Sequence, residues 1–434
     1  MSVIGLIPKD IRAIKGVFSS LRSRNYRIYF IGQGVSLIGT WMQNIALSWL
    51  VYRLTGSVFL LGLIGFTSQI PTFILSPFTG VVTDRHNRLN IMKLTQLFFM
   101  LHALTMTLLV MFNLVQVWHI ITLSVIFGII TAFDAPARQS LVIDLIDDPG
   151  NLGNAIALNS AIFNAARLVG PAIAGIVIAI AGEGICFLFN TLSFAAVIFA
   201  LMQIKISFRK VVGEPVNFKE SFREGFDYTF RTMPIRTLII MLALLSVVGL
   251  SYIVLLPAYA KENMHGSSDT LGYLMSAMGA GALSGALYMA ARKSVLGLAK
   301  VISTSVMVMG AAISLASFSG NMFLSVVALF FGGLTMVLSL SSINTMLQTL
   351  ADEDKRGRVM SFYAMALMGT TPIGNLLAGS IASGIGISWT LLMSGVITVI
   401  SGIWFRMKRK SLRKHVRPIY VTKGILPGLP NDLT

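Results

Sequence analysis

The placement of positive charge is the feature that most constrains how this chain can fold. Of its 34 Lys and Arg residues, 31 lie in every second gap between twelve apolar runs or in the two terminal segments. Arg53 and Lys261 lie in the opposite set of gaps, and Arg167 lies within a run. Because Lys and Arg are retained on the cytoplasmic side during membrane insertion, the pattern predicts an even number of spans with both termini in the cytoplasm.

The number of spans follows from the stretches that contain no Asp, Glu, Lys or Arg. A helix that crosses the hydrocarbon needs about 20 mostly apolar residues, so the three longest stretches, 94–133, 301–351 and 359–405, must each contain two helices. The other spans are the stretches 28–52, 54–83, 184–204, 237–260 and 270–291, and the run 154–181 that Arg167 interrupts. The predicted fold is an all-α membrane protein with twelve transmembrane helices.

The longest polar segment between spans divides the predicted helices into two sets of six. The expected organisation is an amphipathic cytoplasmic segment (1–27), a first six-helix bundle (28–205), a cytoplasmic linker (206–235), a second six-helix bundle (236–406) and a basic cytoplasmic tail (407–434). Within the linker, Phe218, Phe222, Phe226 and Phe230 repeat every four residues, which predicts a helix at the membrane surface. A solvated linker is the alternative.

Composition excludes several functions. The net charge of +17 would suit a nucleic-acid partner, but the basic residues lie in short loops and tails that face anionic lipid headgroups. Cys186 is the only cysteine and no Cys/His cluster is present, so neither a disulfide nor a metal site is expected. The spans contain no paired acids or His-Glu-x-x-His motif, and the chain has no P-loop. No enzyme activity and no cofactor are predicted, and an intramembrane enzyme is the disfavoured alternative.

A cytoplasmic loop between the second and third spans carries the sharpest local motif. The segment Gly80-Val-Val-Thr-Asp84-Arg85-His-Asn-Arg88 resembles the Gly-x-x-x-Asp-Arg-x-Gly-Arg loop of the major facilitator superfamily, although Asn87 and the following Leu depart from that pattern. A gate is expected here: Gly80 allows close helix approach, Asp84 faces the N-terminus of a neighbouring helix, and Arg85 and Arg88 pair with acids or lipid phosphates. An ordinary basic turn is the alternative.

The resemblance extends over nearly the whole chain. The segments Phe133-Asp-Ala-Pro-Ala-Arg-Gln139, Asn154–Ser160 and Arg356-Gly-Arg358 are similar to the branch of the superfamily that contains the bacterial enterobactin exporter. This similarity implies two six-helix bundles in the major facilitator fold, located in the bacterial inner (plasma) membrane.

A further motif lies in the fifth predicted span. Gly170, Pro171 and Gly175 are similar to the helix-five motif associated with antiporters of the superfamily. A Pro-kinked helix with small residues for packing is the alternative interpretation.

Arg167 is the one basic residue within a span. It lies 13 residues beyond Asn154, or roughly 20 Å along a helix, which is too deep to reach the cytoplasmic headgroups easily. A charge at that depth must face protein or a wet cavity, and helical spacing puts Asn164 on the same face. We expect Arg167 and Asn164 to bind substrate; a strut between helices is the alternative.

Other polar residues within the spans extend the predicted binding site. Proton coupling needs a group whose charge changes. The candidates are Asp134 with its i+4 partner Arg138, then Asp84, and then His102, which as a packed histidine would have no such role. The superfamily resemblance implies that spans one, four, seven and ten line a cavity. The further substrate-binding candidates on these spans are therefore Gln33, Asn44, Tyr252, Asn344 and Gln348, unless they serve only to join helices.

The sequence therefore predicts a secondary active transporter that works as a monomer. The expected activity is proton-coupled export, by alternating access, of a siderophore or drug-like small molecule that is anionic or amphiphilic. The alternatives within the fold are a lysophospholipid flippase and an uptake symporter.

Overall fold

The computed structural model describes residues 19–204, 206, 218–292 and 294–427, and every regular element in these residues is a helix. The elements up to residue 202 are η2 (Ser19–Arg22), α2 (Arg24–Thr55), α3 (Val58–Thr67), α4 (Ile70–Arg85), α5 (Arg88–Met111), α6 (Val117–Asp144), η3 (Pro149–Asn151), α7 (Leu152–Ala181) and α8 (Glu183–Met202). Most of the amphipathic segment predicted for residues 1–27 lies outside the described residues.

The later elements begin in the predicted linker. They are α9 (Phe218–Arg231), α10 (Met233–Leu244), η4 (Leu245–Gly249), η5 (Ser251–Leu255), α11 (Leu256–Glu262), α12 (Ser268–Ala291), α13 (Leu298–Ala316), α14 (Met322–Leu350), α15 (Arg356–Ala364), η6 (Met365–Gly369), α16 (Thr370–Ile385) and α17 (Ile387–Thr422). α17 has 36 residues, so much of the predicted basic tail continues this helix.

Ten helical stretches in the described residues are long and apolar enough to cross a membrane. They include neither α2 nor the stretch from α15 to α16. α2 has 32 residues, which is long enough to span, but polar residues such as Gln33, Gln43 and Asn44 lower its hydropathy. The predicted twelve spans include these two stretches, and that number stays a prediction.

The helices form two compact units. Unit 1 contains Met1–Val51, Thr67–Val212 and Ser267–Ser276, and unit 2 contains Tyr52–Phe66, Gly213–Gly266 and Ala277–Thr434. These units differ from the predicted bundles mainly at two helices, because nearly all of α3 groups with unit 2 and the first turns of α12 group with unit 1.

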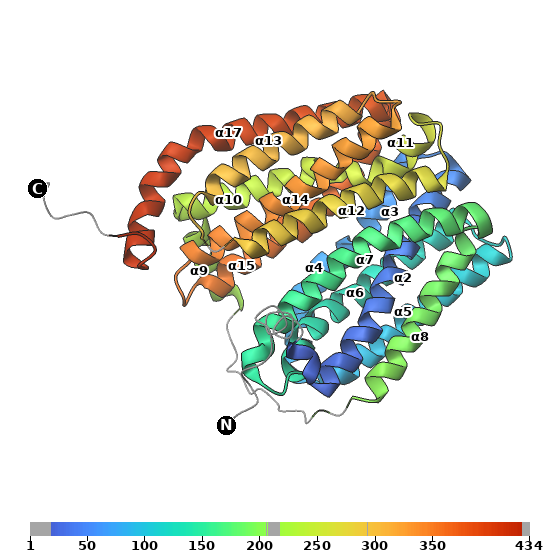
Figure 1. Cartoon of the computed structure of the whole chain (residues 1–434), viewed down its shortest axis with the longest axis horizontal. Coiled ribbons are helices and arrows are strands. Elements are labelled where there is room, and N and C mark those ends of the chain that lie inside the picture. The colour runs from blue at the N-terminus through green and yellow to red at the C-terminus, as the bar shows by residue number, and fades with distance from the viewer. Residues whose placement is uncertain (1–18, 205, 207–217, 293, 428–434) are drawn as a thin grey trace, which may run out of the picture. The chain divides into compact units, whose positions relative to one another are not determined.

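Glycines set the distances between helices in unit 1. A Cβ built on Gly39 of α2 would lie 2.6 Å from Oδ1 of Asn190 in α8, and one on Gly170 of α7 would lie 2.5 Å from Cβ of Trp41 in α2. α5 packs along α8, as Figure 1 shows, with the rings of Phe99 and Phe194 stacked 5.3 Å apart. α2 is thereby held against both α7 and α8.

In unit 2 the linker helix α9 docks on the segment that follows α14. Phe222 and Phe226 pack on Phe362 of α15, and Tyr228 donates a hydrogen bond to Asp352 at 2.9 Å. The aromatic side of α9 therefore contacts protein. Near the end of α17, Nζ of Lys423 donates to the carbonyl oxygens of residues 349 and 351, at the end of α14.

Two glycines of α7 test this packing. Gly170→Ala would press a methyl group onto Trp41 and the carbonyl of Ile38, so we expect it to lower the free energy of unfolding by about 1–3 kcal/mol. Gly153→Ala is the matched control, because nothing lies within 4 Å of its Cβ position, and it should be neutral or slightly stabilising. Thermal unfolding of the purified variants measures both, and equal melting temperatures would contradict the packing role of Gly170.

Candidate functional site

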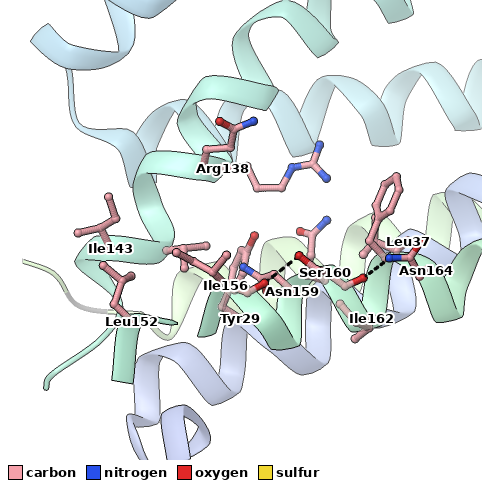
Figure 2. A pocket seen from close by; sticks show the side chains of 14 residues that line it. Tyr29, Leu37, Arg138, Ile143, Leu152, Ile156, Asn159, Ser160, Ile162 and Asn164 are labelled. Carbon is pink, nitrogen blue, oxygen red and sulfur yellow. Dashed lines mark hydrogen bonds between the residues drawn. The ribbon is translucent and has the colours of Figure 1, made fainter. Parts of the chain in front are cut away.

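A cavity of about 580 Å³ lies within unit 1, between α2, α6 and α7. This volume is in the range of sites that hold a drug-sized molecule. Its lining residues are Tyr29, Gln33 and Leu37 of α2, Arg138, Gln139, Val142 and Ile143 of α6, and Leu152, Ile156, Asn159, Ser160, Ile162, Phe163 and Asn164 of α7. Figure 2 shows Arg138 on one wall, with Asn159, Ser160 and Asn164 on the facing wall.

Polar groups on α7 are partly engaged by their own helix. Asn164 donates its Nδ2 proton to the carbonyl of Ser160 at 2.7 Å, and the Ser160 hydroxyl donates to the carbonyl of Ile156 at 3.0 Å. The Tyr26 hydroxyl, which is not among the lining groups, donates to Oδ1 of Asn159 at 3.3 Å. The α7 wall therefore presents fixed amides among apolar side chains.

Arg138, a cation that lines the cavity, is paired with the buried carboxylate of Asp134. Asp134 has no exposed surface, and its Oδ1 accepts hydrogen bonds from Thr95 Oγ1 at 3.0 Å and Gln96 Nε2 at 2.8 Å. Its Oδ2 accepts from Nη2 of Arg138 one turn later. An ionised carboxylate withdrawn from water requires such partners.

Arg138 connects this buried pair to the cavity. Its side chain keeps 31% of its surface exposed, and it lines the cavity while one nitrogen bonds to Asp134. A guanidinium carries five N–H donors in a fixed fork, so the other donors can serve a bound molecule.

The structure brings together three of the predicted site residues. Gln33, Arg138 and Asn164 all line the cavity. The sequence analysis did not single out Tyr29, Gln139 or Asn159, although Tyr29 lies one helical turn before Gln33 and Gln139 follows Arg138 directly. For Tyr29 this spacing carried a signal that could have identified it, whereas adjacent residues such as Arg138 and Gln139 do not share a helix face.

Arg167 does not line this cavity. Its guanidinium carbon lies 5.5 Å from the centre of the Trp41 ring, a distance at which a cation is attracted to an aromatic face. The side chain is half-buried, and Trp41 in turn contacts Phe163 at 6.0 Å between ring centres. Asn44 is exposed on α2 and is not a lining residue either. Substrate binding by Arg167 and Asn44 stays a prediction.

His102 is packed between α5 and α6, away from the cavity. It is 6% exposed, and its ring lies 5.5 Å from that of Phe127. Within the described residues its Nδ1 has no hydrogen-bond partner. The arrangement is that of a core histidine, and a role in proton coupling stays a prediction.

The candidates from the seventh and tenth predicted spans belong to unit 2. Tyr252 is 1% exposed and its hydroxyl donates to Sδ of Met278 at 3.4 Å. Gln348 donates to Asn344 at 2.7 Å. None of the three lines the cavity of unit 1, and their contacts with substrate stay predictions.

The residues of the predicted gate are spread over the ends of α4 and α5. Among the residues that the structure describes, nothing lies within 4 Å of the Cβ position of Gly80. Arg85 is exposed, and the side chain of Asp84 lies outside the described residues. Arg88 pairs with Asp144 at the end of α6, with Nη1 and Oδ2 3.0 Å apart. Gating by these residues stays a prediction.

The antiporter-like motif is a site of close packing. Gly170 faces α2, and a Cβ on Gly175 would lie 2.9 Å from Cα of Gly272 in α12. Ser268 adds a hydrogen bond from its hydroxyl to the Gly175 carbonyl at 3.2 Å. Pro171 lies inside α7 between these contacts. The two glycines lack a side chain and thereby allow α7 to lie close to α2 and α12.

Helical stretches long and apolar enough to cross a membrane, with a cavity large enough for a small molecule within unit 1, are typical of a polytopic membrane protein. The fold is similar to the crystal structure of a bacterial homologue of the human lysosomal transporter Spinster, with a TM-score of 0.70 and 13% identity over 91% of this chain and 98% of that one.

Residues 15–416 match the family described as transmembrane secretion effector, and the chain belongs to this family of major facilitator transporters. It is similar to the staphyloferrin A transporter of Staphylococcus aureus, with 24% identity over 88% of this chain and 96% of that protein. It is also similar to the multidrug efflux pump Tap of Mycolicibacterium fortuitum, with 25% identity over 84% and 91%. The chain is a multi-pass protein of the bacterial inner membrane.

A double-mutant cycle measures what the Asp134–Arg138 pair contributes. Arg138→Gln alone leaves a buried carboxylate without its cation, and we expect a loss of about 3–5 kcal/mol in the free energy of unfolding. Asp134→Asn/Arg138→Gln removes both charges and should recover most of that loss. Thermal unfolding of the single and double variants gives the coupling energy. Additive losses would show that the two charges do not depend on one another.

Proposed function

We propose that this chain is a proton-coupled exporter that moves a siderophore or drug-like amphiphile across the inner membrane by alternating access. The relatives in siderophore transport and drug efflux support the substrate class. The observation that carries the proposal is the Asp134–Arg138 pair, because a buried carboxylate bonds to a cation that lines the cavity; this carboxylate would be the proton carrier.

Protonation of Asp134 changes what Arg138 does. While the carboxylate is ionised the pair is neutral, and the guanidinium is held against α6. A proton on Asp134 removes that attraction, and the cation then needs other acceptors. Gln33 of α2 and Asn159 of α7 both line the cavity and carry amide oxygens. Arg138 would occupy them and displace a neutral substrate, so proton and substrate compete, as antiport requires.

The charge of the substrate decides the direction of coupling. An anionic group that takes Arg138 away from Asp134 would leave a buried carboxylate that binds a proton, so that anion and proton bind together. That linkage gives symport, and the exposed part of Arg138 is the observation that favours an uptake symporter as the second candidate. The sequence predicts an anionic or amphiphilic substrate, and for export we therefore favour a neutral amphiphile.

The proposal includes the predicted topology. Twelve spans in a monomer, with both termini in the cytoplasm, accord with the alternation of charge. Residues outside the cavity, such as Arg167 and Tyr252, would contact substrate only in another step of the transport cycle. The cytoplasmic motif from Gly80 to Arg88 would then act as the gate. A lysophospholipid flippase would instead show transport only of lipid.

The substrate is found first, from the metabolites that cells export with and without this chain under iron limitation and iron sufficiency. In everted membrane vesicles with an acidic interior, we expect wild-type protein to accumulate that compound and a protonophore to abolish the accumulation. Asp134→Asn/Arg138→Gln should still equilibrate the compound without concentrating it, because no group remains to exchange a proton. Accumulation that survives the protonophore would contradict proton coupling.

A further inference from the structure

One acceptor in the cavity wall has no partner. Gln33 is 5% exposed, and its Oε1 receives no hydrogen bond from the residues that the structure describes. A buried carbonyl oxygen left unsatisfied is costly, and such groups in native structures usually await a ligand, an ion or water. Gln33 lines the cavity, and a ligand that displaces the atoms now covering this buried oxygen would bond to it.

The complementary group on the same cavity is Arg138. Its Nη2 is engaged by Asp134, and the remaining guanidinium protons are donors only. The polar part of the cavity thus offers one acceptor that needs a donor and one cation whose free donors need an acceptor. Both requirements are met by a ligand that carries a hydroxyl or amide N–H and a carbonyl, and the smallest such ligand has the two groups side by side.

The apolar part of the cavity lining determines what kind of body the ligand can have. Leu37, Ile143, Ile156, Ile162 and Phe163 contribute apolar walls. Gly34 lets the Ile162 side chain pack against α2, because a Cβ at this position would overlap the end of that side chain. A branched or aromatic body fits such a surface better than an extended polar chain.

We propose that the cavity selects neutral amphiphiles that carry a hydrogen-bond donor beside a carbonyl, with Gln33 Oε1 receiving the donor and Arg138 binding the carbonyl. This selectivity rests on the proposed export function and names the substrate class of the same cavity. Gln33 is then the residue that distinguishes a hydroxylated substrate from its deoxy analogue.

Three neutral probes with one diphenyl body test the assignment. Methyl benzilate has the hydroxyl and the carbonyl, methyl diphenylacetate lacks the hydroxyl, and 1,1-diphenylethanol lacks the carbonyl. Calorimetry on protein in lipid nanodiscs should show methyl benzilate binding about tenfold more tightly than either analogue. Gln33→Met should bind methyl benzilate and methyl diphenylacetate equally, because only the hydroxyl contact is lost.

Two further variants complete the test. Gln203→Met changes an exposed glutamine outside the cavity and should keep the tenfold preference. If Gln33→Met does not fold, Gln33→Leu removes the same acceptor. In each variant, binding of methyl diphenylacetate shows that the cavity is intact. Equal binding of the probes to wild type, no binding at all, or a hydroxyl preference that survives both Gln33 variants would overturn the proposal.

The two proposals fail separately. Proton-driven accumulation without a hydroxyl preference would leave the exporter and remove this selectivity. A hydroxyl preference that Gln33 controls, in a protein that no proton gradient drives, would leave the selectivity and remove the coupling.

Discussion

The arrangement of the cavity depends on one buried carboxylate. Asp134 is withdrawn from water and is held by Thr95 and Gln96 of α5 and by Arg138 of its own helix. These contacts fix α5 against α6 and set where the Arg138 guanidinium lies. Because the cation also lines the cavity, any change in the charge of Asp134 reaches the binding surface directly.

Much of this arrangement is local and was therefore predictable. The i, i+4 spacing of Asp134 and Arg138 indicates a pair on any helix, and the polar residues Gln33 and Asn164 stand out in apolar spans. The helical membrane fold and the superfamily were likewise predicted, because span length and charge placement depend on the bilayer and on short motifs. Whether the two polar stretches, α2 and α15–α16, span the membrane was not decided by hydropathy alone.

The surroundings of the other predicted site residues depend on which helix faces pack together. The spacing of residues along the sequence does not specify this. Arg167 has the depth of a substrate contact, yet it lies over Trp41 because Gly170 brings α7 against α2 at that level. Tyr252 is polar and central in its span, but its hydroxyl is bound to Met278. Gly80 matches a motif of close helix approach, yet none of the described residues lies within 4 Å of its Cβ position.

Proton exchange on ligand binding tests the central claim most directly. The compound whose export depends on this chain is added to purified protein in weakly buffered solution, and the released protons are counted with a pH indicator. If the Asp134–Arg138 pair couples ligand to proton, adding the compound to the wild type releases protons, and the number released rises as the starting pH is lowered. Adding the compound to Asp134→Asn should release none. Equal release from both proteins, or none from the wild type, would contradict the account.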